Sequence, residues 1–205
     1  MAGKYPENFE ALIDMLKTLP GIGKRSAERM AFSIYKWDAE KTRKLGKIIA
    51  ELPERVTKCP ECANLAMDGN KCSICLDSKR DTSLVCVIEE ASQIQNIENS
   101  GFFRGRYHIL GGKITPLKGQ EAHSLNTEIL LKKAKEGEVK EVVLALSYDM
   151  EGQATAIYIA GILRETGVKV TRLAQGMPAG SDISYVDSAT LAAAMSGRTG
   201  IGNID

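Results

Sequence analysis

The sequence lacks the features of a membrane-bound or exported protein. No stretch of its 205 residues approaches the ~20 consecutive apolar residues that a membrane helix needs. The N-terminal residues Met1–Glu10 contain no basic stretch followed by an apolar run, so no signal peptide is visible. We therefore expect a cytoplasmic protein that has no membrane partner.

The chain also lacks a net charge that would indicate a partner. It has 27 Lys and Arg against 26 Asp and Glu, and this balance of +1 says nothing about nucleic acid. The distribution is more informative, because the segment from Lys17 to Lys58 has eleven basic and five acidic side chains. A neutral total with one basic region suits a protein that holds DNA in one place and partners elsewhere.

The N-terminal region has the apolar spacing of amphipathic helices. A first helix is indicated by apolar residues at i, i+3, i+4 and i+7, namely Phe9, Leu12, Ile13 and Leu16. After the turn residues Leu19–Gly23, a second helix is expected to bury Ala27, Met30, Ala31 and Ile34. A third helix, limited by Pro53, is expected to bury Leu45, Ile48, Ile49 and Leu52.

The turn between the first two helices resembles a helix-hairpin-helix DNA-binding motif. Gly21 and Gly23 let the backbone approach a phosphate closely, and the next helix offers unpaired N–H groups at its N-terminus. On that helix Arg25, Arg29 and Lys36 fall within about 40° of one another, opposite the apolar side. These residues predict binding to the DNA backbone; the alternative is an ordinary helical hairpin with solvated charges.

Four of the five cysteines form two CxxC pairs, which are Cys59 with Cys62 and Cys72 with Cys75. Each pair can supply two thiolates to one ion, which is the ligand set of a closed structural zinc site. A redox dithiol and an iron–sulfur cluster are the alternatives. The fifth cysteine, Cys86, lies in an apolar run and is expected to be a small core residue. We call the segment Cys59–Cys75 the four-cysteine knot.

From Leu84 onward, predicted strands and helices alternate, which favours a mostly parallel sheet with helices on both faces. The expected strands are 84–88, 107–110, 139–146 and 168–173, and the expected helices are 91–99, 125–136, 152–166 and 188–195. Glu89 follows the first of these strands, and Asp149 and Glu151 follow the third. Parallel strands bring these three carboxylates, which we call the acidic edge, to one edge of the sheet.

The acidic edge resembles that of Toprim domains, the module shared by topoisomerases, primases and some nucleases. Carboxylates suit Mg²⁺, which in those enzymes assists phosphoryl transfer. The same acids can equally solvate a helix N-terminus or contact a partner. Whether Mg²⁺ binds is therefore left open by the sequence.

The order of hairpin, four-cysteine knot and Toprim-like domain resembles the bacterial RecR family. The segments that carry the resemblance, besides the two CxxC pairs, are Leu19–Phe32, Gly105–Gly112, Thr115–Gly119, Asp149–Thr155 and Gly167–Gly176. The expected fold is multidomain α/β. The expected parts are a helical hairpin domain (1–55), a zinc finger (56–78), a Toprim domain with a mostly parallel, Rossmann-like sheet (79–177), and a short helical oligomerisation segment (178–205).

The resemblance implies a non-catalytic recombination mediator in DNA repair. Members form rings, as tetramers or dimers, and bind single- and double-stranded DNA. They act with RecO, and sometimes RecF, to load RecA onto DNA coated by single-strand-binding protein. On this chain Arg25 and Arg29, with Lys24 next, become the expected DNA contacts, and Glu89 and Glu151 match the family's acidic positions, where RecO docks.

The acidic edge departs from the family pattern. Asp149 stands where the family usually has a neutral residue, and Gln153 where it usually has Glu, so the negative charge is redistributed.

Two other functions fit the same motifs. One is a Mg²⁺-dependent Toprim nuclease that uses Glu89, Asp149 and Glu151. The other is a structural DNA-binding ring protein with no loading role.

Overall fold

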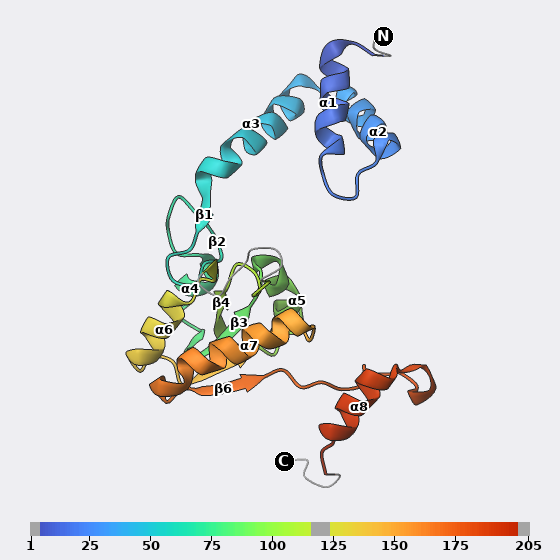
Figure 1. The fold of residues 1–205 in the computed structure, drawn as a ribbon. Coiled ribbons are helices and arrows are strands. Elements are labelled where there is room, and N and C mark those ends of the chain that lie inside the picture. The colour runs from blue at the N-terminus through green and yellow to red at the C-terminus, as the bar shows by residue number, and fades with distance from the viewer. Residues whose placement is uncertain (1–4, 116–123, 201–205) are drawn as a thin grey trace. The chain divides into compact units, whose positions relative to one another are not determined.

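The computed structural model describes residues 5–115 and 124–200 (Figure 1). It divides the chain into two compact units, Met1–Arg55 and Val56–Asp205, each with its own buried apolar cluster. Residues 116–119, part of the Thr115–Gly119 motif, lie outside the described residues. None of the helices that the structure describes is long and apolar enough to span a bilayer.

In the first unit, two helices form the predicted hairpin. Helix α1 (Glu7–Lys17) packs on α2 (Lys24–Tyr35). Ala27 and Ala31 are fully buried because their small side chains let the two helices approach closely. All four apolar residues predicted for α1 contribute to this cluster, which confirms the expected spacing.

Helix α3 (Ala39–Arg55) differs from the expectation in two respects. It continues through Pro53 to Arg55, so Pro53 does not limit it. None of its described residues is buried, and Ile48, Ile49 and Leu52 each expose about half of their surface or more. The prediction that this apolar stripe is buried within the chain is therefore wrong. Apolar periodicity shows that a helix has an apolar face, but it does not show which surface covers that face.

The second unit is built on a four-stranded parallel sheet. Its strands are β3 (Asp81–Ile88), β4 (Gly105–Ile109), β5 (Glu141–Leu144) and β6 (Lys169–Arg172). Their order in the sheet is β4-β3-β5-β6, and all three pairings are parallel. The mixed α/β fold with a parallel sheet is thus confirmed.

Alternate side chains of β3 enter two different cores. Val85 and Val87 pack with α6 (Glu128–Lys135) and α7 (Met150–Leu163) on one face. Cys86 and Ile88 face the other side. There they share a core with α5 (Ile94–Asn99) and the four cysteines of the knot. The knot thus covers part of the second face, where the sequence pattern suggested helices alone.

The remaining elements are short. The four-cysteine knot contains β2 (Leu65–Met67), which pairs antiparallel with β1 (Val56–Lys58), and it ends in the single turn α4 (Ser73–Leu76). Single 3₁₀ turns precede α5 and follow α7. They are η1 (Ala91–Gln93) and η4 (Arg164–Thr166). The C-terminal segment contains η5 (Ile183–Tyr185) and α8 (Ser188–Ser196).

Helix α7 starts at a tight turn that requires glycine at position 152. The Gly152 N–H donates to the Asp149 carboxylate at 2.7 Å, which caps the helix. A Cβ at Gly152 would lie 2.2 Å from the Ser147 carbonyl oxygen, and this backbone atom cannot move aside cheaply. Gly161, in the same helix, has open space around the corresponding position.

We expect Gly152→Ala to lower the free energy of unfolding by about 1–3 kcal/mol, because the added methyl group overpacks the turn. The matched control is Gly161→Ala. It should raise the stability by up to about 1 kcal/mol through helix propensity alone. Urea denaturation followed by circular dichroism measures both. Equal stability of the two variants would contradict the steric argument.

Candidate functional site

The four cysteines of the knot converge on one point. All are buried, and their sulfur atoms lie within 4.8 Å of one another, although they come from two separate turns. The Sγ atoms of Cys62 and Cys72 are 3.6 Å apart, close to the ~3.8 Å expected between two ligands of tetrahedral zinc. No disulfide joins the described cysteines. The cluster is therefore compatible with a structural zinc site.

The chemistry of the cluster also fits a cation. Burial raises the pKa of the Cys72 thiol, because an isolated thiolate is poorly stabilised away from water. A bound divalent ion removes this penalty by holding the thiolates in their charged form. Such an ion would serve folding, since four thiolates leave no open position for a substrate. Cys86 is also buried, with its pKa raised to about 12, and it is no member of the cluster.

Polar contacts attach the knot to strand β4 and to helix α6. The Ile109 N–H at the end of β4 donates to the Cys62 carbonyl at 2.9 Å. Lys133 on α6 reaches the Glu61 carboxylate at 2.5 Å and the Glu61 carbonyl at 3.2 Å. Together with Lys71, Lys133 lowers the pKa of Glu61 to about 2. Glu61 and Lys133 were missed by the sequence reasoning, because no periodic pattern joins residues so far apart.

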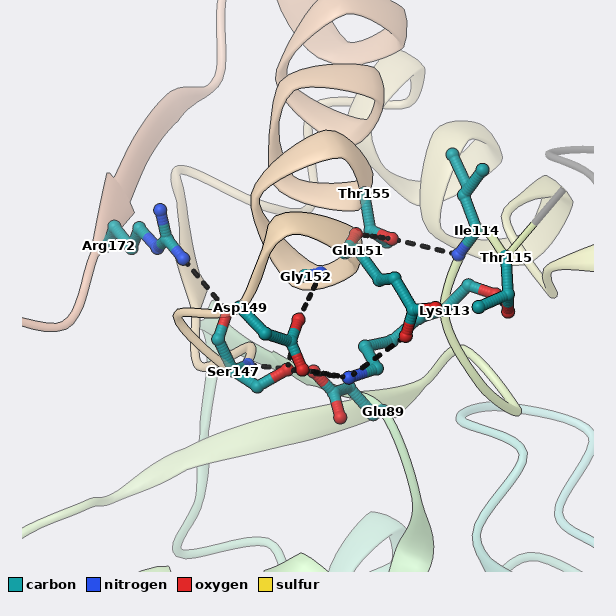
Figure 2. A network of polar contacts seen from close by, with 10 residues as sticks. All are labelled: Glu89, Lys113, Ile114, Thr115, Ser147, Asp149, Glu151, Gly152, Thr155 and Arg172. Carbon is teal, nitrogen blue, oxygen red and sulfur yellow. Dashed lines mark hydrogen bonds and ion pairs between the residues drawn. The ribbon is translucent and has the colours of Figure 1, made fainter. Parts of the chain in front are cut away.

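The three residues of the acidic edge come together in one polar network, shown in Figure 2. Glu89 follows β3 and is buried. Its Oε1 accepts hydrogen bonds from the Ser147 N–H at 2.7 Å and the Ser147 hydroxyl at 2.6 Å. Asp149 caps α7, and Glu151 lies in the first turn of that helix. The parallel sheet thus gathers these carboxylates at one edge.

The network contains a basic residue that the sequence reasoning did not select. Lys113 follows β4, and its Nζ lies 2.5 Å from Asp149 Oδ2, 3.7 Å from Glu151 Oε2 and 3.0 Å from Ser147 Oγ. The hydrogen bond between Lys113 and Asp149 raises the pKa of the lysine and lowers that of the aspartate. Lys113 also follows a parallel strand, so the rule that selected the acids would have found it.

A second basic group borders the network from β6. Arg172 donates to the Ser147 carbonyl at 3.0 Å, and its guanidinium lies 3.9 Å from the centre of the Tyr148 ring. Figure 2 shows Arg172 approaching the turn from the side opposite Lys113. The 147–149 turn is therefore held by cationic groups on both sides.

The candidate DNA-contact residues lie at the start and along one side of α2. Lys24, Arg25, Arg29 and Lys36, which we call the basic face, are all exposed, as are Gly21 and Gly23. Gly21 has a φ of +77°, which glycine adopts without strain. Within the described residues α2 has no side-chain cap and no acidic residue in its first turn. Its N-terminal N–H groups thus face outward beside cationic side chains.

Two apolar residues of α2, Met30 and Phe32, remain partly exposed. Met30 was expected inside, but it exposes 42% of its surface because only Ala27 and Ala31 face α1 directly. The Phe32 ring packs on Phe9, with the ring centres 4.8 Å apart, and on Tyr5 at 5.6 Å.

Family models match three consecutive parts of the chain. A model described as "RecR, helix-hairpin-helix" matches residues 9–52. A Toprim domain model matches residues 83–174, and a model described as "RecR, C-terminal" matches residues 176–199. The Toprim match includes Glu89, Lys113, Asp149 and Glu151.

Curated relatives are similar over nearly the full length. Recombination protein RecR of Acidothermus cellulolyticus is 42% identical over 194 residues, which cover 95% of this chain and 97% of the relative. The protein of the same name from Moorella thermoacetica is 43% identical with the same coverage. That of Bifidobacterium adolescentis is 40% identical over 201 residues, covering 98% of this chain and all of the relative.

We expect Cys72→Ser to lose bound zinc and to unfold the four-cysteine knot, because three thiolates leave the tetrahedron incomplete. Zinc per chain is measured by atomic absorption after gel filtration, and knot folding by amide hydrogen exchange of residues 56–78. Cys86→Ser is the matched control, since it alters a buried cysteine outside the cluster and should keep its zinc. Full zinc content in Cys72→Ser would refute the four-thiolate site.

Proposed function

The chain belongs to the RecR family of recombination proteins, and from this premise we propose that it is a DNA-binding recombination mediator. It acts in the cytoplasm with RecO, and in some contexts RecF. Together they load RecA onto single-stranded or gapped DNA coated by single-strand-binding protein. The observation that carries this proposal is the family match over 95% of the chain to relatives named as recombination proteins. That name describes no enzyme, and we assign the chain no catalytic role.

The first step of this role is contact with the DNA backbone. Gly21 and Gly23 let the hairpin approach a phosphate, which then meets the outward N–H groups at the start of α2. Lys24, Arg25, Arg29 and Lys36 add positive charge on the same exposed helix. Contacts of this kind do not read base sequence, so they suit both single- and double-stranded DNA.

The second step is assembly of several chains into a ring, a tetramer or a dimer. The exposed apolar stripe of α3, formed by Ile48, Ile49 and Leu52, supports this proposal. The C-terminal segment, residues 178–205, is the second proposed oligomerisation element. The other proposed parts are the DNA-binding domain at 1–55, the zinc finger at 56–78 and the Toprim domain at 79–177.

The third step is docking of RecO, for which we propose the acidic edge. Glu151 and Asp149 are partly exposed there, with side-chain accessibilities of 42% and 51%. Glu89 is buried beneath them and supports the 147–149 turn through Ser147. Exposed carboxylates at a sheet edge suit a partner that presents basic side chains.

A Mg²⁺-dependent Toprim nuclease is the second candidate, and the convergence of Glu89, Asp149 and Glu151 favours it. It predicts DNA cleavage that requires Mg²⁺ and that Glu151→Ala abolishes. A supercoiled plasmid incubated with a high concentration of the protein and Mg²⁺ tests this on an agarose gel. A plasmid that stays intact under these conditions would exclude the nuclease function.

We expect Arg25→Ala with Arg29→Ala to weaken DNA binding about equally for all sequences. The slope of log affinity against log salt concentration should fall by about two, because two phosphate contacts are lost. The matched control removes two exposed lysines of α6, Lys132→Ala with Lys135→Ala, and should bind as the unchanged chain does. Fluorescence anisotropy with labelled oligonucleotides measures both. Normal DNA binding by the variant that lacks Arg25 and Arg29 would refute the proposal that the basic face contacts DNA.

We expect the chain to accelerate the RecA ATPase on single strands coated by single-strand-binding protein, but only when cognate RecO is also present. The Arg25→Ala, Arg29→Ala variant should accelerate it less, because the mediator must hold DNA. A coupled ATPase assay measures the rate. No acceleration with active partners would contradict the mediator role and leave a structural DNA-binding ring protein.

A further inference from the structure

The acidic edge of this chain offers a divalent cation few free carboxylate oxygens. A Toprim site would hold Mg²⁺ through oxygen ligands in near-octahedral geometry. Here Glu89 Oε1 already accepts two hydrogen bonds from Ser147. Asp149 Oδ1 accepts the Gly152 N–H as the cap of α7, and Asp149 Oδ2 is paired with Lys113. Glu151 Oε2 also lies 3.7 Å from the Lys113 ammonium, so a Mg²⁺ ion at this position would have to displace the lysine, and the residues as arranged do not fit it.

The position between these acids is taken by an ammonium group. We propose that Lys113 supplies a built-in cation to the acidic edge, so that this Toprim domain is assembled without a divalent metal. Its Nζ contacts Asp149 Oδ2 at 2.5 Å and Ser147 Oγ at 3.0 Å, and lies 3.7 Å from Glu151 Oε2. An ammonium has three hydrogen-bond donors and no acceptor; here it donates to Asp149 and Ser147, and Glu151 lies within ion-pair range.

Backbone hydrogen bonds of the residues before and after Lys113 hold it at this position. On the N-terminal side, the N–H groups of Gly111 and Gly112 donate to the Glu89 carbonyl at 2.9 and 3.0 Å. This turn, with positive φ at both glycines, brings the chain from β4 across the end of β3. The Lys113 ammonium therefore approaches the same strand end that carries Glu89.

On the C-terminal side, Thr155 of α7 fixes the next residue. The Ile114 N–H donates to the Thr155 hydroxyl at 2.9 Å, and that hydroxyl donates to the Glu151 carbonyl at 2.7 Å. Thr155 is fully buried, so this link is rigid. The backbone on either side of Lys113 is thus anchored, once to Glu89 and once to the turn of α7 that carries Glu151. Figure 2 shows the second of these anchors, from Ile114 to Thr155.

The ammonium and a divalent ion would compete for the same oxygens. The Lys113 side chain exposes only 21% of its surface, and its pKa is raised by Asp149, so it remains charged at neutral pH. An intramolecular cation needs no binding from solution, so it loses less freedom than a free ion would on occupying this position. This inference holds whether or not the chain loads RecA.

The test is Mn²⁺ binding, measured by isothermal titration calorimetry and by the electron paramagnetic resonance signal of free Mn²⁺, on the zinc-loaded full chain. We expect no saturable Mn²⁺ site at the acidic edge of the unchanged chain. Lys113→Met keeps the length of the side chain but removes its charge. It should gain one site, bound at least about tenfold more tightly than any Mn²⁺ binding of the unchanged chain. Adding Glu151→Gln to Lys113→Met should abolish that site.

Lys169→Met is the matched control, because Lys169 forms a surface ion pair with Glu141 at 3.0 Å. It should bind no more Mn²⁺ than the unchanged chain. Saturable binding by the unchanged chain that Glu151→Gln abolishes would overturn the proposal. So would a folded Lys113→Met variant that gains no site. If that variant does not fold, Lys113→Arg decides: the arginine keeps the charge, so it should fold and remain free of Mn²⁺, and a gained site would refute the inference.

Discussion

The parallel pairing of β3 with both β4 and β5 is the constraint on which the polar network depends. Because these strands run in the same direction, the residues that follow them leave the sheet at one edge. Glu89, Lys113 and Asp149 come from three different strands, yet they need only short turns to meet. Each has a different task in the turn before α7. Glu89 holds Ser147, Asp149 caps the helix, and Lys113 joins the exposed acids.

The sequence predicted those parts of the site that follow from strand order or ligand spacing. The acidic edge required only that two apolar runs be parallel strands, and the cysteine cluster required only two CxxC pairs. Lys113 was missed although, like the acids, it follows a parallel strand, because Leu110, Gly111 and Gly112 separate it from β4 and only acidic residues were sought there. Its position depends on backbone contacts on both sides, and one of them, between Ile114 and Thr155, joins residues 41 apart.

Helix α3 shows a second limit of periodicity. The apolar spacing of Ile48, Ile49 and Leu52 is the same whether the stripe faces its own chain or another surface. The helix itself was predicted correctly, whereas the surface that covers its stripe was not. A similar limit applies to the four-cysteine knot. Its CxxC spacing indicates the metal but not the packing of the knot on Cys86 and Ile88, which depends on how β3 alternates its side chains.

The contact between the four-cysteine knot and β4 affects whether the edge of the sheet can pair with a strand of another molecule. β4 lies at one edge of the sheet, where unpaired backbone groups invite a strand from another molecule. The Cys62 carbonyl occupies one of these donors, the Ile109 N–H, and the knot covers the adjoining face. The four-cysteine knot therefore also blocks part of this edge against pairing with a strand of another molecule. Unfolding of the knot would leave the Ile109 N–H and the adjoining face of the sheet open to such pairing.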